Sequence, residues 1–74
     1  MRITFTKKHV KLDGVIIGEF DKDRGVPFAL LHYKLNGYSL LRTPSARNIE
    51  GVKRKVRASI REDVAFLGDR KSVV

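Results

Sequence analysis

The chain has 74 residues, with sixteen Lys and Arg against eight Asp and Glu, and its formal net charge is +8. A chain of this length is expected to form one domain, residues 1–74, with a small core, and the absence of Cys excludes disulfides and thiolate metal sites. No apolar run approaches the ~18 residues that span a membrane, and the excess of positive charge favours an anionic partner.

Alternation of polar and apolar side chains predicts an antiparallel meander of three or four strands within residues 2–42. In the first strand, residues 2–6, the apolar side chains of Ile3 and Phe5 lie on one face. Residues 21–27 are mostly charged and contain Gly and Pro, so this segment is the predicted loop between two hairpins.

The first hairpin is predicted from its turn. Asp13 and Gly14 favour a type I′ turn, because both central positions of that turn have positive φ. Continued without interruption, the pairing places Val10 opposite Ile17. The other expected pairs are Leu12 with Val15 and Lys8 with Glu19. The opposite face of this hairpin then carries His9, Lys11, Ile16 and Phe20.

Asn36 and Gly37 favour a second type I′ turn, which would pair Tyr33 with Leu40. One face of this hairpin is the predicted partner of the C-terminal helix, and its residues are Leu31, Tyr33, Leu35, Tyr38 and Leu40. The other face mixes apolar and basic side chains. Together with Lys11 it is a candidate contact surface, formed by Phe28, Leu30, His32, Lys34 and Leu41. The alternative is that Ile3 and Phe5 fold over this outer face.

Apolar side chains recur at steps of three and four over residues 49–67, which predicts one long C-terminal helix, followed by a short tail. Asn48 is the predicted N-cap and Gly68 the predicted C′ residue. Gly51 lies inside the helix, where Gly costs about 1 kcal/mol relative to Ala. A helix start at Thr43–Pro44 is the alternative boundary. The predicted fold class is α+β, with the helix packed on one face of the sheet.

Arg and Lys side chains are concentrated on and just before this helix, and between residues 42 and 61 Glu50 is the single acid. Guanidinium groups suit bidentate contact with phosphate or carboxylate. The candidate site for nucleic acid or an acidic partner is therefore Arg42, Arg47, Lys53, Arg54, Arg57 and Arg61. The alternative interpretation is a solvated helix face whose long side chains cover the edge of the core.

Catalytic patterns are missing from the sequence. His9 and His32 share the predicted outer face, but no Asp, Glu or Ser forms a recognisable triad with them, and a metal site would need further ligands. The chain also contains no glycine-rich phosphate loop. We therefore expect a protein that is not an enzyme and that uses no cofactor, metal or small-molecule substrate.

From Phe28 to Ile60 the chain is predicted to run strand, Asn-Gly turn, strand, a Leu-Arg-Thr exit and helix. This order resembles the arm-type DNA-binding domains of phage integrases and is similar to small proteins of tailed phages. In such arm domains the sheet enters the major groove. The resemblance thus implies that Lys11, His32 and Lys34 touch DNA.

These observations favour a small basic regulator of transcription that binds DNA or RNA through the basic side of the helix. The alternative is a phage-type protein that binds an acidic surface of a host protein such as RNA polymerase, and the mixed outer face would suit such an interface. Either function would place the protein in the cytoplasm, which is that of the host cell if the protein is phage-encoded. Neither function involves a membrane.

Overall fold

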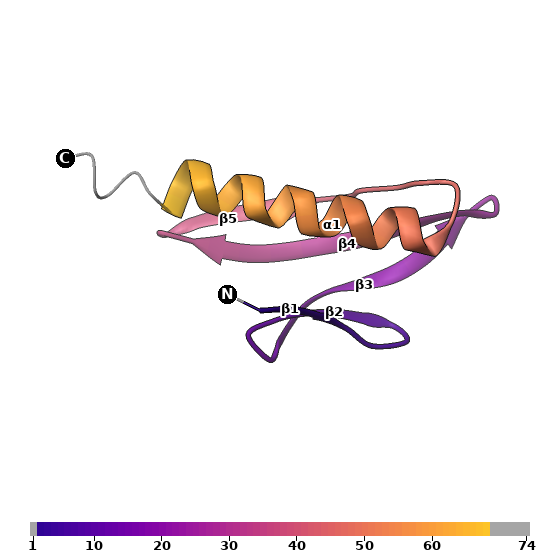
Figure 1. Ribbon diagram of the computed structural model, residues 1–74, viewed down its shortest axis with the longest axis horizontal. Coiled ribbons are helices and arrows are strands. Elements are labelled where there is room, and N and C mark those ends of the chain that lie inside the picture. Colours follow the sequence, from indigo (N-terminus) through magenta and orange to yellow (C-terminus); the bar gives the residue numbers. More distant parts are fainter. Residues whose placement is uncertain (1, 69–74) are drawn as a thin grey trace.

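A computed structural model describes residues 2–68 as two layers, a five-stranded antiparallel sheet and one helix that packs on one face of it (Figure 1). The strands follow one another in the sheet in chain order. The elements are β1 Ile3–Phe5, β2 His9–Leu12, β3 Val15–Asp23, β4 Val26–Leu35, β5 Tyr38–Arg42, α1 Ile49–Asp63 and a π-helical turn, η1, Val64–Gly68. The predicted α+β fold is confirmed, with more strands than expected, and the predicted C-terminal tail lies outside the described residues.

Both predicted hairpin turns are present, with positive φ at Asp13 and Gly14 and at Asn36 and Gly37. A third turn of the same kind was not predicted, and it joins β3 to β4 through Arg24 and Gly25.

The predicted loop at residues 21–27 is therefore wrong. The strands continue to Asp23 and resume at Val26, and the side chains of residues 21–26 are exposed. Charged side chains at a hairpin tip that projects past the core stay in water, so folding does not desolvate them.

The register between β2 and β3 contains a bulge. Leu12 pairs with Val15 as predicted, but the register shifts between Val10 and Lys11, so that Val10 lies opposite Gly18 instead of Ile17. The ion pair expected between Lys8 and Glu19 is consequently absent from the register, in which His9 is the residue opposite Glu19. The shift also moves Phe20 from the predicted outer face to the face that covers the core.

The edge strand β1 pairs with β2, with Ile3 opposite Leu12 and Phe5 opposite Val10. Ile3 and Phe5 therefore pack against the core, and the alternative in which they fold over the outer face is wrong.

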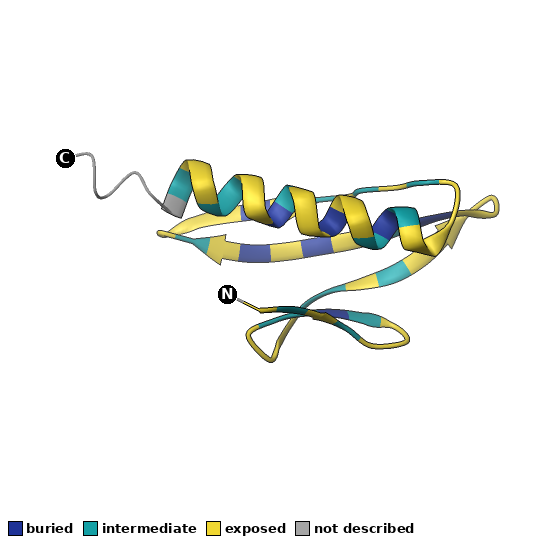
Figure 2. Cartoon of the chain, in the orientation of Figure 1, coloured by how far each residue is buried: buried dark blue, intermediate teal, exposed yellow. Residues whose placement is uncertain are grey.

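The core lies between the sheet and α1 (Figure 2). The apolar side chains that recur along the helix, which we call the stripe, include Val52, Val56 and Ile60, which are fully buried, whereas Ile49 is 39% exposed at the helix start. The sheet supplies the other buried residues of this cluster, which are Val10, Ala29, Leu31, Tyr33 and Leu40. Each fully buried aliphatic side chain contributes about 1.5–3 kcal/mol to the free energy of unfolding. Val52, Val56 and Ile60 therefore largely hold α1 on the sheet.

An Asn side chain binds each end of the segment formed by α1 and η1. Asn48 is the N-cap, as predicted, and its Oδ1 accepts a hydrogen bond of 2.8 Å from the Gly51 amide. The alternative start at Thr43–Pro44 is wrong, since residues 43–48 precede the helix. At the other end Gly68, expected just after the helix, is the last residue of η1, and the Asn36 side-chain amide donates to the Leu67 carbonyl.

Candidate functional site

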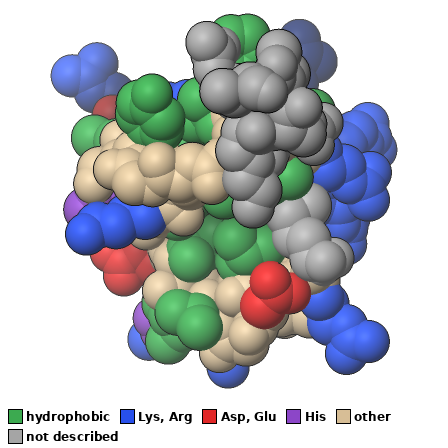
Figure 3. All heavy atoms as spheres, turned by 90° about the vertical axis from the view of Figure 1, so that its left-hand side faces the viewer, with side chains coloured by type: hydrophobic (Ala, Val, Ile, Leu, Met, Phe, Trp, Pro, Cys, Tyr) green, Lys and Arg blue, Asp and Glu red, His purple; other side chains and the backbone are tan. Residues whose placement is uncertain are grey.

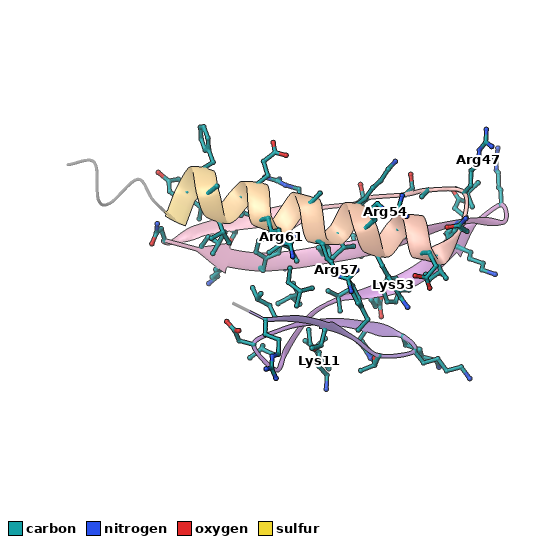
Figure 4. The ribbon with its side chains drawn as sticks, viewed as in Figure 1. Lys11, Arg47, Lys53, Arg54, Arg57 and Arg61 are labelled. Carbon is teal, nitrogen blue, oxygen red and sulfur yellow. The ribbon has the colours of Figure 1, made fainter. Side chains whose placement is uncertain are left out.

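Four cationic side chains of α1, which we call the basic flank, follow the buried stripe around the helix: Lys53, Arg54, Arg57 and Arg61. Lys53, Arg57 and Arg61 each come one residue after a stripe residue, and a step of one residue turns 100° about a helix axis. Figure 4 shows Lys53 and Arg57 directed towards the β1–β2 hairpin. The stripe that builds the core thus also positions the flank.

Two residues of the basic flank cover an aromatic ring. The guanidinium carbon of Arg57 lies 4.9 Å from the centroid of the Phe5 ring, and Lys53 Nζ lies 5.6 Å from it. The Phe5 ring in turn contacts the Phe20 ring, with centroids 5.9 Å apart. These cation–π contacts hold the edge strand β1 against α1 and fix the direction of Arg57. The interpretation that long helix side chains cover the edge of the core therefore holds for Lys53 and Arg57.

Acidic partners are scarce along the basic flank. Lys53 Nζ lies 3.8 Å from Glu50, whereas Arg54, Arg57 and Arg61 form no salt bridge within residues 2–68. All three of these Arg residues are exposed. In the end-on view of Figure 3, Lys and Arg side chains gather along the right-hand side of the molecule. The flank therefore offers guanidinium groups to an external anion.

Arg42 lies on β5, away from the basic flank, and binds Asp63 of α1. Its Nε lies 3.2 Å from Oδ2 of Asp63, and its second terminal nitrogen lies 3.1 Å from Oδ1. The Tyr33 hydroxyl donates to the same carboxylate. Arg42 was predicted to bind an external anion, but the structure already gives it an internal carboxylate partner, so we leave it out of the proposed interface.

The Asp63 carboxylate is nearly buried, with 13% of the side chain exposed. Burial alone would raise the pKa of Asp63, but hydrogen bonds from Tyr33 and Arg42 and the charge of Arg42 outweigh burial and lower it. Burial, followed by the hydrogen bond to Asp63, raises the pKa of Tyr33. This three-residue cluster was not predicted. The sequence did contain one sign of this cluster. Asp63 follows Ile60 by three residues and therefore lies on the buried side of the helix.

Arg47 lies immediately before the N-cap, at the β3–β4 end of the molecule (Figure 4). It lines an open hollow of about 540 Å³ together with Lys7, Lys22, the N-cap Asn48 and Ile49. Asp21 of β3 also lines this hollow, although its register position opposite Phe28 puts its side chain on the outer face. Arg47 extends the row of cations towards the start of the helix, where the helix dipole favours anions.

The outer face of the sheet carries the second set of predicted residues. The register places Leu30, His32 and Lys34 of β4 on this face, with Leu41 of β5 opposite His32. Lys11 of β2 lies on the same side of the sheet, and Phe28 is partly buried there. The bulge adds an acid that was not predicted on this face, because Glu19 lies opposite Leu30. The outer face is therefore mixed in charge.

His9, His32 and Glu19 line one shallow hollow of about 260 Å³ on the outer face. Among residues 2–68 no group of three or more His, Asp or Glu side chains is arranged to hold a metal ion. Within the same residues no helix has both the length and the apolar character needed to cross a membrane.

Comparison of the chain with protein-family models, curated proteins and solved structures finds no match. The resemblance to integrase arm domains therefore stays a prediction.

Proposed function

We propose that this protein is a small basic regulator of transcription that binds nucleic acid, without catalysis, through the phosphate backbone. The contact surface is the basic flank of α1, extended by Arg47 at the start of the helix. The observation that carries this proposal is the row of exposed Arg side chains without acidic partners in the described part of the chain.

The spacing of these cations suits a run of phosphates. Side chains three or four residues apart on a helix have Cβ atoms about 5–6 Å apart, as for Arg54, Arg57 and Arg61. From Arg54 to Arg61 the row extends roughly 10 Å along the helix at about 1.5 Å per residue, and Arg47 continues the row beyond the N-cap. A row of this length can follow one strand of a duplex over several phosphates, which fixes the protein on the backbone without reading sequence.

Stacking on bases is not part of this proposal. The Phe5 ring lies beside the basic flank, and Arg57 and Lys53 already cover it. Single-stranded binding usually needs exposed aromatic rings within the basic surface. The flank therefore favours a duplex over a single strand.

Removing two cations tests the site. We expect Arg54→Ala/Arg61→Ala to weaken binding to a duplex of random sequence by about tenfold at ~50 mM salt, because both phosphate contacts are lost. Fluorescence anisotropy of a labelled duplex measures the affinity. The matched control is Lys55→Ala, which removes one positive charge from the other side of the same helix, where Lys55 Nζ donates to the Ser45 carbonyl. Equal affinities for the double variant and the wild type would refute the proposal.

Binding to a host protein such as RNA polymerase is the second candidate function. Its supporting observation is the exposure of large apolar side chains on the outer face, among them Leu41 at 62%. In that case Leu41→Asp should abolish binding to purified RNA polymerase, measured by biolayer interferometry, while Arg54→Ala/Arg61→Ala would affect duplex binding alone.

A further inference from the structure

Large apolar side chains are exposed at the centre of the outer face of the sheet, on the side away from α1. Ile16 is 56% exposed, Leu30 40% and Leu41 62%. They come from three different strands, β3, β4 and β5. A group of this kind on an ordered sheet is typical of a contact surface, because its apolar area stays in water unless a second surface covers it.

Charges on the outer face are separated by sign along the strands. Asp21 lies towards the β3–β4 turn, Glu19 lies level with Leu30, and His32 and Lys34 lie towards the β4–β5 turn. None of these four side chains forms a salt bridge with another described residue. The face therefore has an acidic end, an apolar centre and a basic end.

We propose that the outer face is the interface of a homodimer. In a two-fold dimer both copies offer the same surface, so that surface must complement itself. The two-fold axis would lie between the two stacked sheets, perpendicular to the strands. Rotation about this axis makes the strands of the second copy run opposite to those of the first. The acidic end of each copy then meets the basic end of the other. Asp21 of β3 then lies within one strand of Lys34 of the second copy, and Glu19 within one strand of its His32, while the Leu30 side chains lie near the axis.

A second copy fits this face better than nucleic acid does. Glu19 and Asp21 would repel phosphates, whereas they complement Lys34 of another copy. The dimer also leaves the basic flank free, because α1 covers the opposite side of the sheet (Figure 1). Dimer formation is thus independent of the proposed nucleic-acid binding.

The size of the face predicts a weak dimer. Strands lie about 4.8 Å apart and rise about 3.3 Å per residue, so the four strands β2 to β5, which average about seven residues, cover roughly 450 Å². Two such faces bury roughly 900 Å² in total, which is just below the usual range of specific interfaces. We therefore expect the dimer to dissociate at micromolar concentrations.

Charge reversal at the two ends tests this symmetry. By sedimentation equilibrium of nucleic-acid-free protein, we expect the wild type to be in a monomer–dimer equilibrium. Asp21→Lys and Lys34→Asp should each raise the dimer dissociation constant about tenfold, because each change places like charges together at two symmetric points. An equimolar mixture of the two variants should recover the wild-type affinity as a heterodimer, and so should the double variant. Leu30→Asp should be monomeric at every concentration.

Arg54→Ala is the control and should leave the dissociation constant unchanged, and circular dichroism shows that each variant is folded. A wild type that stays monomeric up to ~1 mM, where even weak association is visible, would overturn the proposal. So would a dimer that both charge reversals leave unchanged, or variants whose mixture associates no better than each one alone.

Discussion

Gly18 and Gly51 interrupt otherwise regular patterns, and in each case a neighbouring atom explains the Gly. A Cβ on Gly18 would lie 2.4 Å from the Leu30 carbonyl oxygen and 2.6 Å from a methyl carbon of Leu31. A Cβ on Gly51 would lie 2.8 Å from the Cβ of Ala46, in the segment that leads into the helix. The cost of Gly inside α1 is therefore offset by the close packing of the first helical turn on Ala46.

Gly18→Ala should be strongly destabilising, because the atom that the new Cβ would strike belongs to the backbone of β4, which cannot rotate away. We expect the free energy of unfolding to fall by about 1–3 kcal/mol, a large part of the stability of a domain this small. Urea denaturation measures this loss. Gly51→Ala is the comparison, and its loss should be smaller because Ala gains helix propensity. A Gly18→Ala protein as stable as the wild type would show that β3 and β4 are not held this close.

At the scale of the elements, local signals were predictable from the sequence and contacts between elements were not. The turns at Asp13 and at Asn36 were predicted because an Asp-Gly or Asn-Gly dipeptide encodes positive φ by itself. The bulge between β2 and β3 was missed because the turn dipeptide fixes the register only next to the turn. The cluster around Asp63 was missed for a similar reason, since it depends on where α1 lies along β4 and β5.

The cluster around Asp63 joins α1 to β4 and β5, and the prediction at this scale concerns acid. The folded state lowers the pKa of Asp63, so the unfolded chain binds this proton more readily. The stability that this carboxylate contributes is complete above the ordinary Asp pKa of about 3.9 and is lost as the pH falls through the lower folded value.

We expect Asp63→Asn to be less stable than the wild type at pH 7, with the difference shrinking below about pH 4, where the wild type also loses the ion pair. Urea unfolding at a series of pH values measures the difference. Glu62→Gln, at the neighbouring exposed position, is the control and should show no comparable dependence on pH. A difference between Asp63→Asn and the wild type that is constant from pH 7 to pH 3 would contradict this role of the carboxylate.

At the scale of the whole molecule, the two layers carry different surfaces. The helix layer presents Arg54 and Arg61 without acidic partners in the described part of the chain, and the sheet layer presents a face on which acids and bases are separated. The sequence predicted that cations gather on the helix, because their positions follow from helix periodicity. The arrangement of the sheet face depended on the bulge, which put Glu19 opposite Leu30. One small core thus supports two surfaces that can act at the same time.

The salt dependence of duplex binding tests the central claim most directly, because each phosphate that a cation neutralises adds about 0.9 to the slope of log affinity against log salt concentration. Four contacts, from Arg47, Arg54, Arg57 and Arg61, predict a slope of about −3.6 on B-form DNA. Anisotropy titrations between ~50 and ~200 mM salt give this slope. A slope close to zero, or no binding at the lowest salt concentration, would contradict the account.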